Sequence, residues 1–66
     1  MVLTVNGEQR RVENVTTVAE LLIGLGLDPR AVVVEQNRRI VRRIEHAGTP
    51  VHEGDAIELV HFVGGG

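Results

Sequence analysis

The chain has 66 residues, 42% of them hydrophobic, with a net charge of -2 and a pI of about 5.8. This length suits one domain with a small core, and it argues against a self-contained enzyme with a deep substrate pocket. The absence of cysteine excludes a disulfide scaffold, a cysteine metal site and a thiol nucleophile. No apolar run reaches the roughly 18 residues of a membrane span, and the first residues lack signal-peptide features, so we expect a cytoplasmic protein.

A β-hairpin is expected at the start of the chain. Residues 1–6 alternate between inward apolar positions and outward ones, as in a strand with one buried face. Asn6 and Gly7 both tolerate a positive φ, which a two-residue type I′ turn requires. Residues 8–13 are therefore predicted to form the return strand, with Val12 as its clearest inward residue.

One main helix is predicted to begin at Thr17. Thr17 and Glu20 have the spacing of a capping box, in which each side chain bonds to the other residue's main chain. Apolar residues follow at helical spacing and form one stripe: Val18, Leu21, Leu22 and Leu25. Gly26 suits the left-handed residue that ends a helix, and Pro29 prevents continuation.

The rest of the chain is predicted to be mostly extended. Val32 and Val34 are expected to face the helix, and one helical turn is expected near Ile44. The predicted segments are a strand at 31–36, a turn at 37–39, a short strand at 40–41, an irregular stretch at 42–53 and a last strand at 56–63.

This order of elements predicts an α+β fold. A hairpin, one main helix and returning strands give a mixed sheet that is covered on one face. In a β-grasp arrangement the first and last strands are parallel neighbours at the centre, and the helix supplies the crossover that this pairing needs. We predict a β-grasp domain over residues 1–63 and a flexible glycine tail over residues 64–66.

The predicted tail has one chemical group of interest, the carboxylate of Gly66. Gly64 and Gly65 carry no side chain, so the three glycines reach about 10 Å at most and would fit a narrow active-site channel. A carboxylate must be activated, for instance as an acyl-adenylate, before a nucleophile attacks it. The chain has no lysine, so no side-chain amine competes for such a carbonyl. The alternative interpretation is an incidental frayed end.

Several segments, in this order and spacing, resemble the thiamine-biosynthesis sulfur carrier family, ThiS. The matching segments are 3–8 (LTVNGE), 17–22 (TVAELL), 32–37 (VVVEQN), 40–43 (IVRR), 54–60 (GDAIELV) and 63–66 (VGGG). The resemblance covers essentially the whole chain. It implies a ubiquitin-like β-grasp fold and a protein co-substrate, not an enzyme.

The resemblance also implies a mechanism. A ubiquitin-activating-enzyme-like adenylyltransferase uses ATP and magnesium to adenylate the terminal carboxylate, here that of Gly66. A sulfurtransferase or cysteine desulfurase supplies the sulfur that displaces AMP and leaves a thiocarboxylate. Thiazole synthase then takes this sulfur into the thiazole ring of thiamine. The carrier itself is expected to bind no cofactor.

Two other functions stay open from the sequence. The small subunit of molybdopterin synthase uses the same thiocarboxylate chemistry and differs in its acceptor. A β-grasp interaction module with an incidental tail would form no thiocarboxylate at all.

Val33, Val60 and Phe62 are predicted to lie on the sheet face away from the helix, where they would bind partners. The alternative is scattered apolar residues on an ordinary surface.

The remaining charged and histidine residues give weaker signals. His46, His52 and His61 lack a standard metal spacing, so we predict no metal site and expect them at the surface or at an edge. The arginine pairs at 10–11, 38–39 and 42–43 are expected to be solvated, or to complement an acidic partner. Nucleic-acid binding is disfavoured by the negative net charge and by a single aromatic residue.

Overall fold

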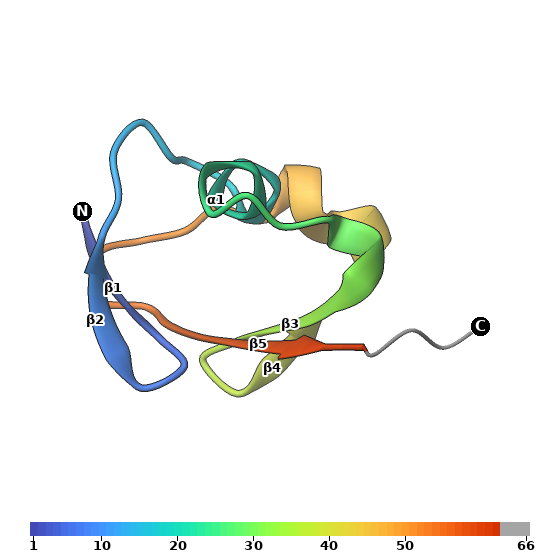
Figure 1. The fold of residues 1–66 in the computed structure, drawn as a ribbon. Coiled ribbons are helices and arrows are strands. Elements are labelled where there is room, and N and C mark those ends of the chain that lie inside the picture. The colour runs from blue at the N-terminus through green and yellow to red at the C-terminus, as the bar shows by residue number, and fades with distance from the viewer. Residues whose placement is uncertain (63–66) are drawn as a thin grey trace.

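A five-stranded mixed sheet forms one layer of the fold, and helix α1 covers one of its faces (Figure 1). The structure, a computed structural model, describes residues 1–62. Its strands are β1 (Val2–Val5), β2 (Glu8–Arg11), β3 (Val32–Gln36), β4 (Arg39–Val41) and β5 (Ala56–His61). Its helices are α1 (Val18–Gly24) and the 3₁₀ helices η1 (Pro29–Ala31) and η2 (Arg43–Gly48).

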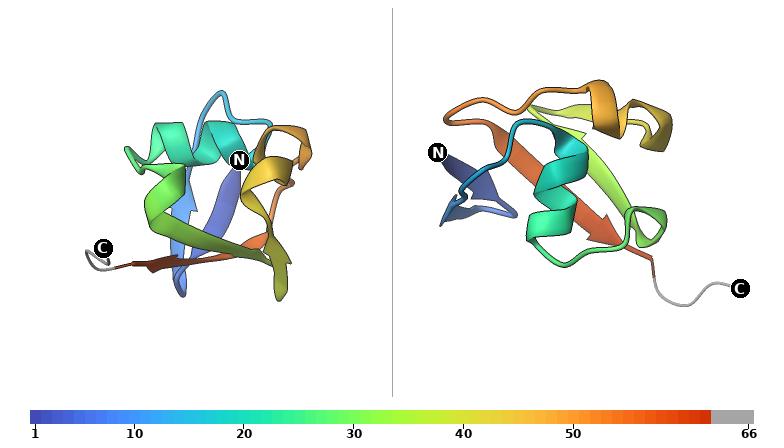
Figure 2. Two further views of the ribbon diagram at one scale, coloured as in Figure 1. Left: turned by 90° about the vertical axis from the view of Figure 1, so that its right-hand side faces the viewer. Right: turned by 90° about the horizontal axis from the view of Figure 1, so that it is seen from above.

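The sheet order is β2-β1-β5-β3-β4, which places the last strand at the centre. β1 and β5 are parallel neighbours, and the other three pairings are antiparallel. Figure 2 shows α1 lying across the sheet, in the crossover between the hairpin and β3. The predicted β-grasp topology is confirmed. β5 covers residues 56–61 of the predicted strand at 56–63, of which Val63 lies outside the described residues.

Two type I′ turns close the two hairpins. Asn6 and Gly7 have φ values of 50° and 82°, as the sequence predicts. Asn37 and Arg38 have φ values of 50° and 70° and join β3 to β4. The second turn is one residue shorter than predicted, because Arg39 already pairs with β3.

The caps of α1 confirm the prediction. The Thr17 side chain accepts a hydrogen bond from the Glu20 N–H, and the Glu20 side chain bonds back to the Thr17 main chain. At the other end Gly26 has a φ of 73°. The Leu27 N–H donates to the Leu22 carbonyl at 2.9 Å, which is the long bond of a Schellman ending. Local chemistry therefore defines both ends of this seven-residue helix.

The core lies between α1 and the sheet. It contains Leu3, Val5, Val15, Val18, Leu21, Leu22, Val32, Val34, Val41, Val51, Ile57 and Leu59.

β2 contributes no buried side chain and ends at Arg11, so the predicted strand at 8–13 was too long. Val12 follows this strand and packs against the core from the loop.

A carboxylate ties the loop before β5 to the hairpin of β3 and β4. Asp55 accepts hydrogen bonds from the His52 N–H at 2.9 Å, the Gln36 side chain at 2.9 Å and the Asn37 side chain at 3.1 Å. Burial raises the pKa of Asp55, but these hydrogen bonds outweigh that effect and hold the pKa below its ordinary value. The ionised form of Asp55 therefore stabilises the folded state.

Candidate functional site

β5 is the last strand before the predicted tail in the sequence. It pairs with β1 on one side and with β3 on the other. The Phe62 N–H donates to the Ala31 carbonyl at 2.9 Å, so the main chain stays bonded to its neighbour one residue beyond the strand. Gly64, Gly65 and Gly66 lie outside the described residues. The last described residue is therefore held by the sheet.

The predicted apolar residues lie together on the open face of the sheet, away from α1. Val33 lies directly opposite Val60 on the paired strands. Val60 and Phe62 are 58% and 59% exposed, and Val33 is half-buried. The sequence correctly predicted these orientations because side chains alternate along a strand. Whether this surface binds a partner stays a prediction.

Ile40 is a fourth residue of this surface that the sequence analysis missed. It lies in β4 opposite Glu35, next to Val33 across the strand pair, and is 64% exposed. The alternation of Ile40 with the buried Val41 was the signal that would have placed it outward. We call Val33, Ile40, Val60 and Phe62 together the open-face patch.

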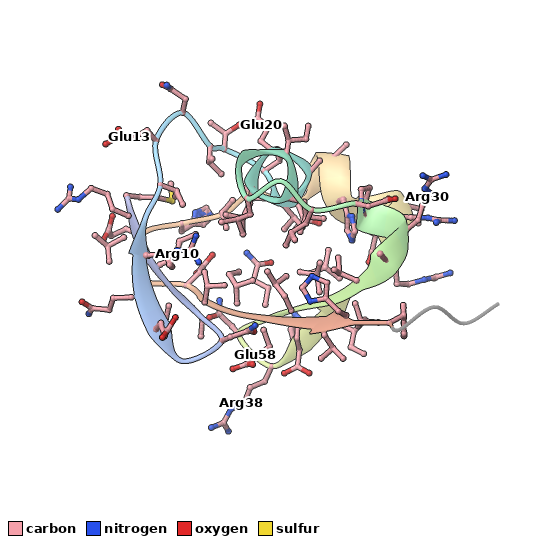
Figure 3. All side chains as sticks on the ribbon, in the orientation of Figure 1. Arg10, Glu13, Glu20, Arg30, Arg38 and Glu58 are labelled. Carbon is pink, nitrogen blue, oxygen red and sulfur yellow. The ribbon has the colours of Figure 1, made fainter. Side chains whose placement is uncertain are left out.

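Two carboxylates border the open-face patch. Glu35 of β3 and Glu58 of β5 are directly opposite each other. Figure 3 shows Glu58 on the side of the sheet away from α1. Like charges in such a pair weaken a sheet. The open face is therefore apolar near the end of β5 and acidic further back along the strands.

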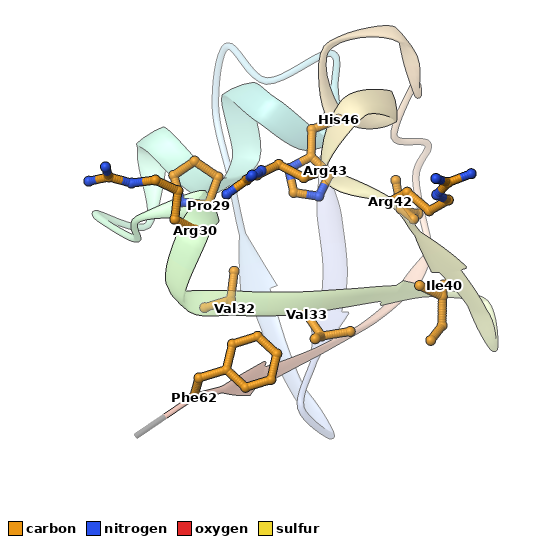
Figure 4. Close-up of a pocket in the computed structure, with 10 residues that line it drawn as sticks. Pro29, Arg30, Val32, Val33, Ile40, Arg42, Arg43, His46 and Phe62 are labelled. Atoms are coloured by element: carbon orange, nitrogen blue, oxygen red, sulfur yellow. The ribbon is translucent and has the colours of Figure 1, made fainter. Parts of the chain in front are cut away.

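A hollow of about 310 Å³ lies beside Phe62, between η1 and η2 on one side and the sheet on the other (Figure 4). Its lining comprises four aliphatic residues, Pro29, the three arginines Arg30, Arg42 and Arg43, and also His46 and Phe62. None of the described residues that line it is acidic. Val33, Ile40 and Phe62 belong both to this hollow and to the open-face patch, so the two surfaces are continuous.

The prediction that His46 lies at the surface or at an edge was wrong. The His46 side chain comes from η2, which packs against α1, and the residue is only 5% exposed. Figure 4 shows its ring between η2 and β3. His52 and His61 are exposed, as expected. Among residues 1–62 no group of three or more metal-ligating side chains is close enough to hold an ion.

Asp28 and Arg30 form an ion pair at the rim of this hollow. The Arg30 Nη2 and the Asp28 Oδ2 are 3.0 Å apart, and the Arg30 N–H also donates to Asp28. The hydrogen bond from the Arg30 side chain lowers the pKa of Asp28, and the same bond raises the pKa of Arg30. The Asp28 carboxylate is therefore already paired with Arg30.

The family is settled by comparison with known sequences. The model of the ThiS family matches residues 3–66, which is nearly the whole chain. The chain belongs to the ThiS family. A ThiS relative from Bacillus subtilis, named sulfur carrier protein ThiS, is 35% identical over 65 residues, covering 97% of this chain and 98% of the relative. The resemblance inferred from the sequence is confirmed.

Two longer relatives contain a ThiS-like segment. Proteins named thiazole synthase from Magnetococcus marinus and Paramagnetospirillum magneticum are 44% and 46% identical to this chain over 66 residues. The chain spans only 20% of the length of each of these relatives. A segment similar to this chain therefore occurs within proteins that bear the name thiazole synthase.

Solved structures of the ThiS family have the same fold. The crystal structure of a thiamine biosynthesis protein (ThiS) from Geobacter metallireducens has a TM-score of 0.85 and 39% identity, with full coverage of both chains. A solution structure of a thiamine biosynthesis protein from the same organism has a TM-score of 0.82 and 39% identity, covering 100% of this chain and 88% of that one.

Among residues 1–62 no helix is long and apolar enough to cross a membrane.

Proposed function

We propose that this chain is a sulfur carrier of thiamine biosynthesis, in which the carboxylate of Gly66 carries the sulfur. The observation that supports this function best is membership of the ThiS family across residues 3–66, a range that includes the three glycines. The Bacillus subtilis relative, which matches over nearly its full length, is named a sulfur carrier protein. In this role the chain is a protein co-substrate, and its proposed setting is the cytoplasm.

The proposed reaction has two steps. An adenylyltransferase related to ubiquitin-activating enzymes uses ATP and magnesium to join AMP to the Gly66 carboxylate, with release of pyrophosphate. In the second step the terminal sulfur of a persulfide on a sulfurtransferase or cysteine desulfurase attacks the acyl-adenylate and displaces AMP. A thiol then cleaves the resulting acyl disulfide, so that the thiocarboxylate and a new disulfide form. Glycine suits both steps, because no side chain obstructs attack at its carbonyl.

Thiazole synthase is the proposed acceptor of this sulfur. Two relatives with that name contain a segment similar to the whole of this chain. This supports a functional interaction between the carrier and the synthase. The open-face patch is the proposed docking surface. It is apolar, largely exposed and adjacent to the end of β5, so a partner bound there would lie beside the last described residue, Phe62.

An intact-mass measurement tests the carrier function. The chain is incubated with an activating enzyme from the same organism, ATP, magnesium, a persulfide sulfur donor and a thiol reductant. We expect one oxygen to be replaced by sulfur, and we expect no change in a control variant that lacks Gly66. An unchanged mass in the complete reaction would contradict the proposal. The proposal would also be contradicted if the protein isolated from cells had no free carboxylate at Gly66.

Replacement of Phe62 tests the docking surface. Phe62→Asp places a charge in the open-face patch, so we expect the dissociation constant for the partner to rise about tenfold or more. Ile23→Asp is the matched control, because Ile23 is 75% exposed but lies on α1, on the covered side of the sheet. Calorimetric titration measures both variants. Equal losses of affinity in the two would mean that the patch has no special role.

A further inference from the structure

The hollow beside Phe62 combines apolar walls with positive charge. Aliphatic surface comes from Val32, Val33, Ile40 and Val41. The three arginines surround it, and within residues 1–62 no acidic side chain is part of the lining. Such a hollow suits a ligand that joins an apolar body to a negative group.

The His46 ring lines this hollow and carries an unpaired polar atom. Its Nδ1 is buried and has no hydrogen-bond partner in the described structure. A buried polar atom without a partner is rare, and leaving it unpaired destabilises the folded state. Pro29 or an aliphatic side chain cannot satisfy it, because these lining groups neither donate nor accept a side-chain hydrogen bond. Because less than 1 Å² of Nδ1 is accessible, an acceptor oxygen of a bound ligand would reach a protonated Nδ1 only after a small shift of the side chains around the ring.

Arg43 is the arginine best placed to share that ligand. Figure 4 shows its side chain reaching from η2 past the His46 ring toward Pro29, whereas Arg30 and Arg42 point away to the two sides. The ion pair between Arg30 and Asp28 is the only one among residues 1–62. Arg43 is exposed and forms no ion pair within the described part of the chain, so its guanidinium can meet an anion. One opposing charge near it is that of Asp28, whose pKa is lowered mainly by the hydrogen bonds from Arg30 and also by the charge of Arg43.

We propose that the hollow receives a carboxylate side chain of the partner protein that docks on the open-face patch, with Arg43 and His46 donating to it. A protein carboxylate fits better than a free phosphate, because its methylene groups would lie against the aliphatic walls. The hollow also shares Val33, Ile40 and Phe62 with the patch, so a partner bound to the patch reaches it. This inference rests on the proposed function, because it describes the same docking event.

Charge reversal at Arg43 tests the inference. Purified activating enzyme and purified thiazole synthase are each titrated with the wild type, Arg43→Glu and the control Arg10→Glu, at low and high salt. Arg10 is an exposed arginine on β2, at the other edge of the sheet. We expect Arg43→Glu to weaken the binding of one partner about tenfold and to reduce its salt dependence. The control is expected to stay within about twofold.

Replacement of His46 separates binding from folding. His46→Phe keeps a planar ring and removes the unpaired nitrogen, so we expect an unchanged or higher melting temperature with several-fold weaker partner binding. An Asp→Lys or Glu→Lys change on the partner that restores the affinity of Arg43→Glu would identify the carboxylate. A loss of stability without a loss of binding in His46→Phe would count against the proposal.

The outcomes distinguish this inference from the proposed function. If Phe62→Asp weakens binding and Arg43→Glu does not, the carboxylate assignment is overturned and the docking surface stands. If inorganic phosphate shifts the NMR signals of the His46 ring while Arg43→Glu leaves partner affinity unchanged, the hollow is a small-anion site and the assignment is overturned. If the wild type binds neither protein, the proposed function itself fails.

Discussion

The Asn6 side chain links the first hairpin to the strand that precedes the tail. The Leu59 N–H of β5 donates to the Asn6 Oδ1 at 2.7 Å, and the Asn6 Nδ2 donates to the Leu59 carbonyl at 3.3 Å. The amide group thus pairs with Leu59 as a strand residue would. Asn6 also has a φ of 50°, so it serves the turn and the sheet at once.

Replacement of Asn6 separates these two contributions. Asn6→Gly keeps the positive φ but removes both hydrogen bonds, so we expect a loss of about 2 kcal/mol in the free energy of unfolding. Asn6→Ala removes the same bonds and adds left-handed strain, for a total loss of about 3 kcal/mol. For a domain of this size, 1 kcal/mol lowers the melting temperature by about 4–8 °C. The glycine variant is therefore expected to melt about 8–16 °C below the wild type.

Thermal unfolding followed by circular dichroism measures this difference, and amide exchange locates it. We expect the Leu59 amide to exchange faster in Asn6→Gly, because its acceptor is gone. Asn14→Gly is the matched control, since Asn14 is exposed and has a φ of 57°, but its side chain makes no hydrogen bond to any of residues 1–62. This control is expected to change stability by less than about 0.5 kcal/mol. Equal melting temperatures for the two glycine variants would refute the reasoning about Asn6.

Three further predictions concern stability. Thr17→Ala removes the cap of α1 and is expected to cost about 1 kcal/mol in chemical denaturation, whereas Thr17→Ser should retain most of it; equal losses would exclude the cap. The lowered pKa of Asp55 means that its carboxylate stabilises the fold above about pH 4, and this contribution is lost as the pH falls from there through the folded pKa. Unfolding measured against pH should show this loss in the wild type and less of it in Asp55→Asn, and identical profiles would count against the assignment. Glu58→Lys replaces a repulsive pair with Glu35 by an attractive one, so we expect a gain of about 0.2–1 kcal/mol that shrinks in high salt; no gain at low salt would contradict it.

Local features of this fold were predictable from short stretches of sequence. The turn at Asn6 and Gly7, the cap at Thr17 and the left-handed Gly26 each depend on the conformational preferences of a few neighbouring residues. Alternation along the strands correctly placed Val60 and Phe62 outward, because a strand has a period of two. The resemblance to the ThiS family, carried by segments spread over the whole chain, predicted the fold that the solved relatives share.

Features that depend on how distant segments pack were not predictable in this way. Val15 and Val51 enter the core from irregular segments, which have no periodicity to indicate an inward face. His46 is buried because η2 packs on α1 and lies over β3, an arrangement that no local preference of a histidine reveals. The same packing brings η2, with Arg43 and His46, beside Phe62 at the end of β5. Residue types and their spacing were enough for the turns and caps, whereas the hollow exists only because separate elements meet there in three dimensions.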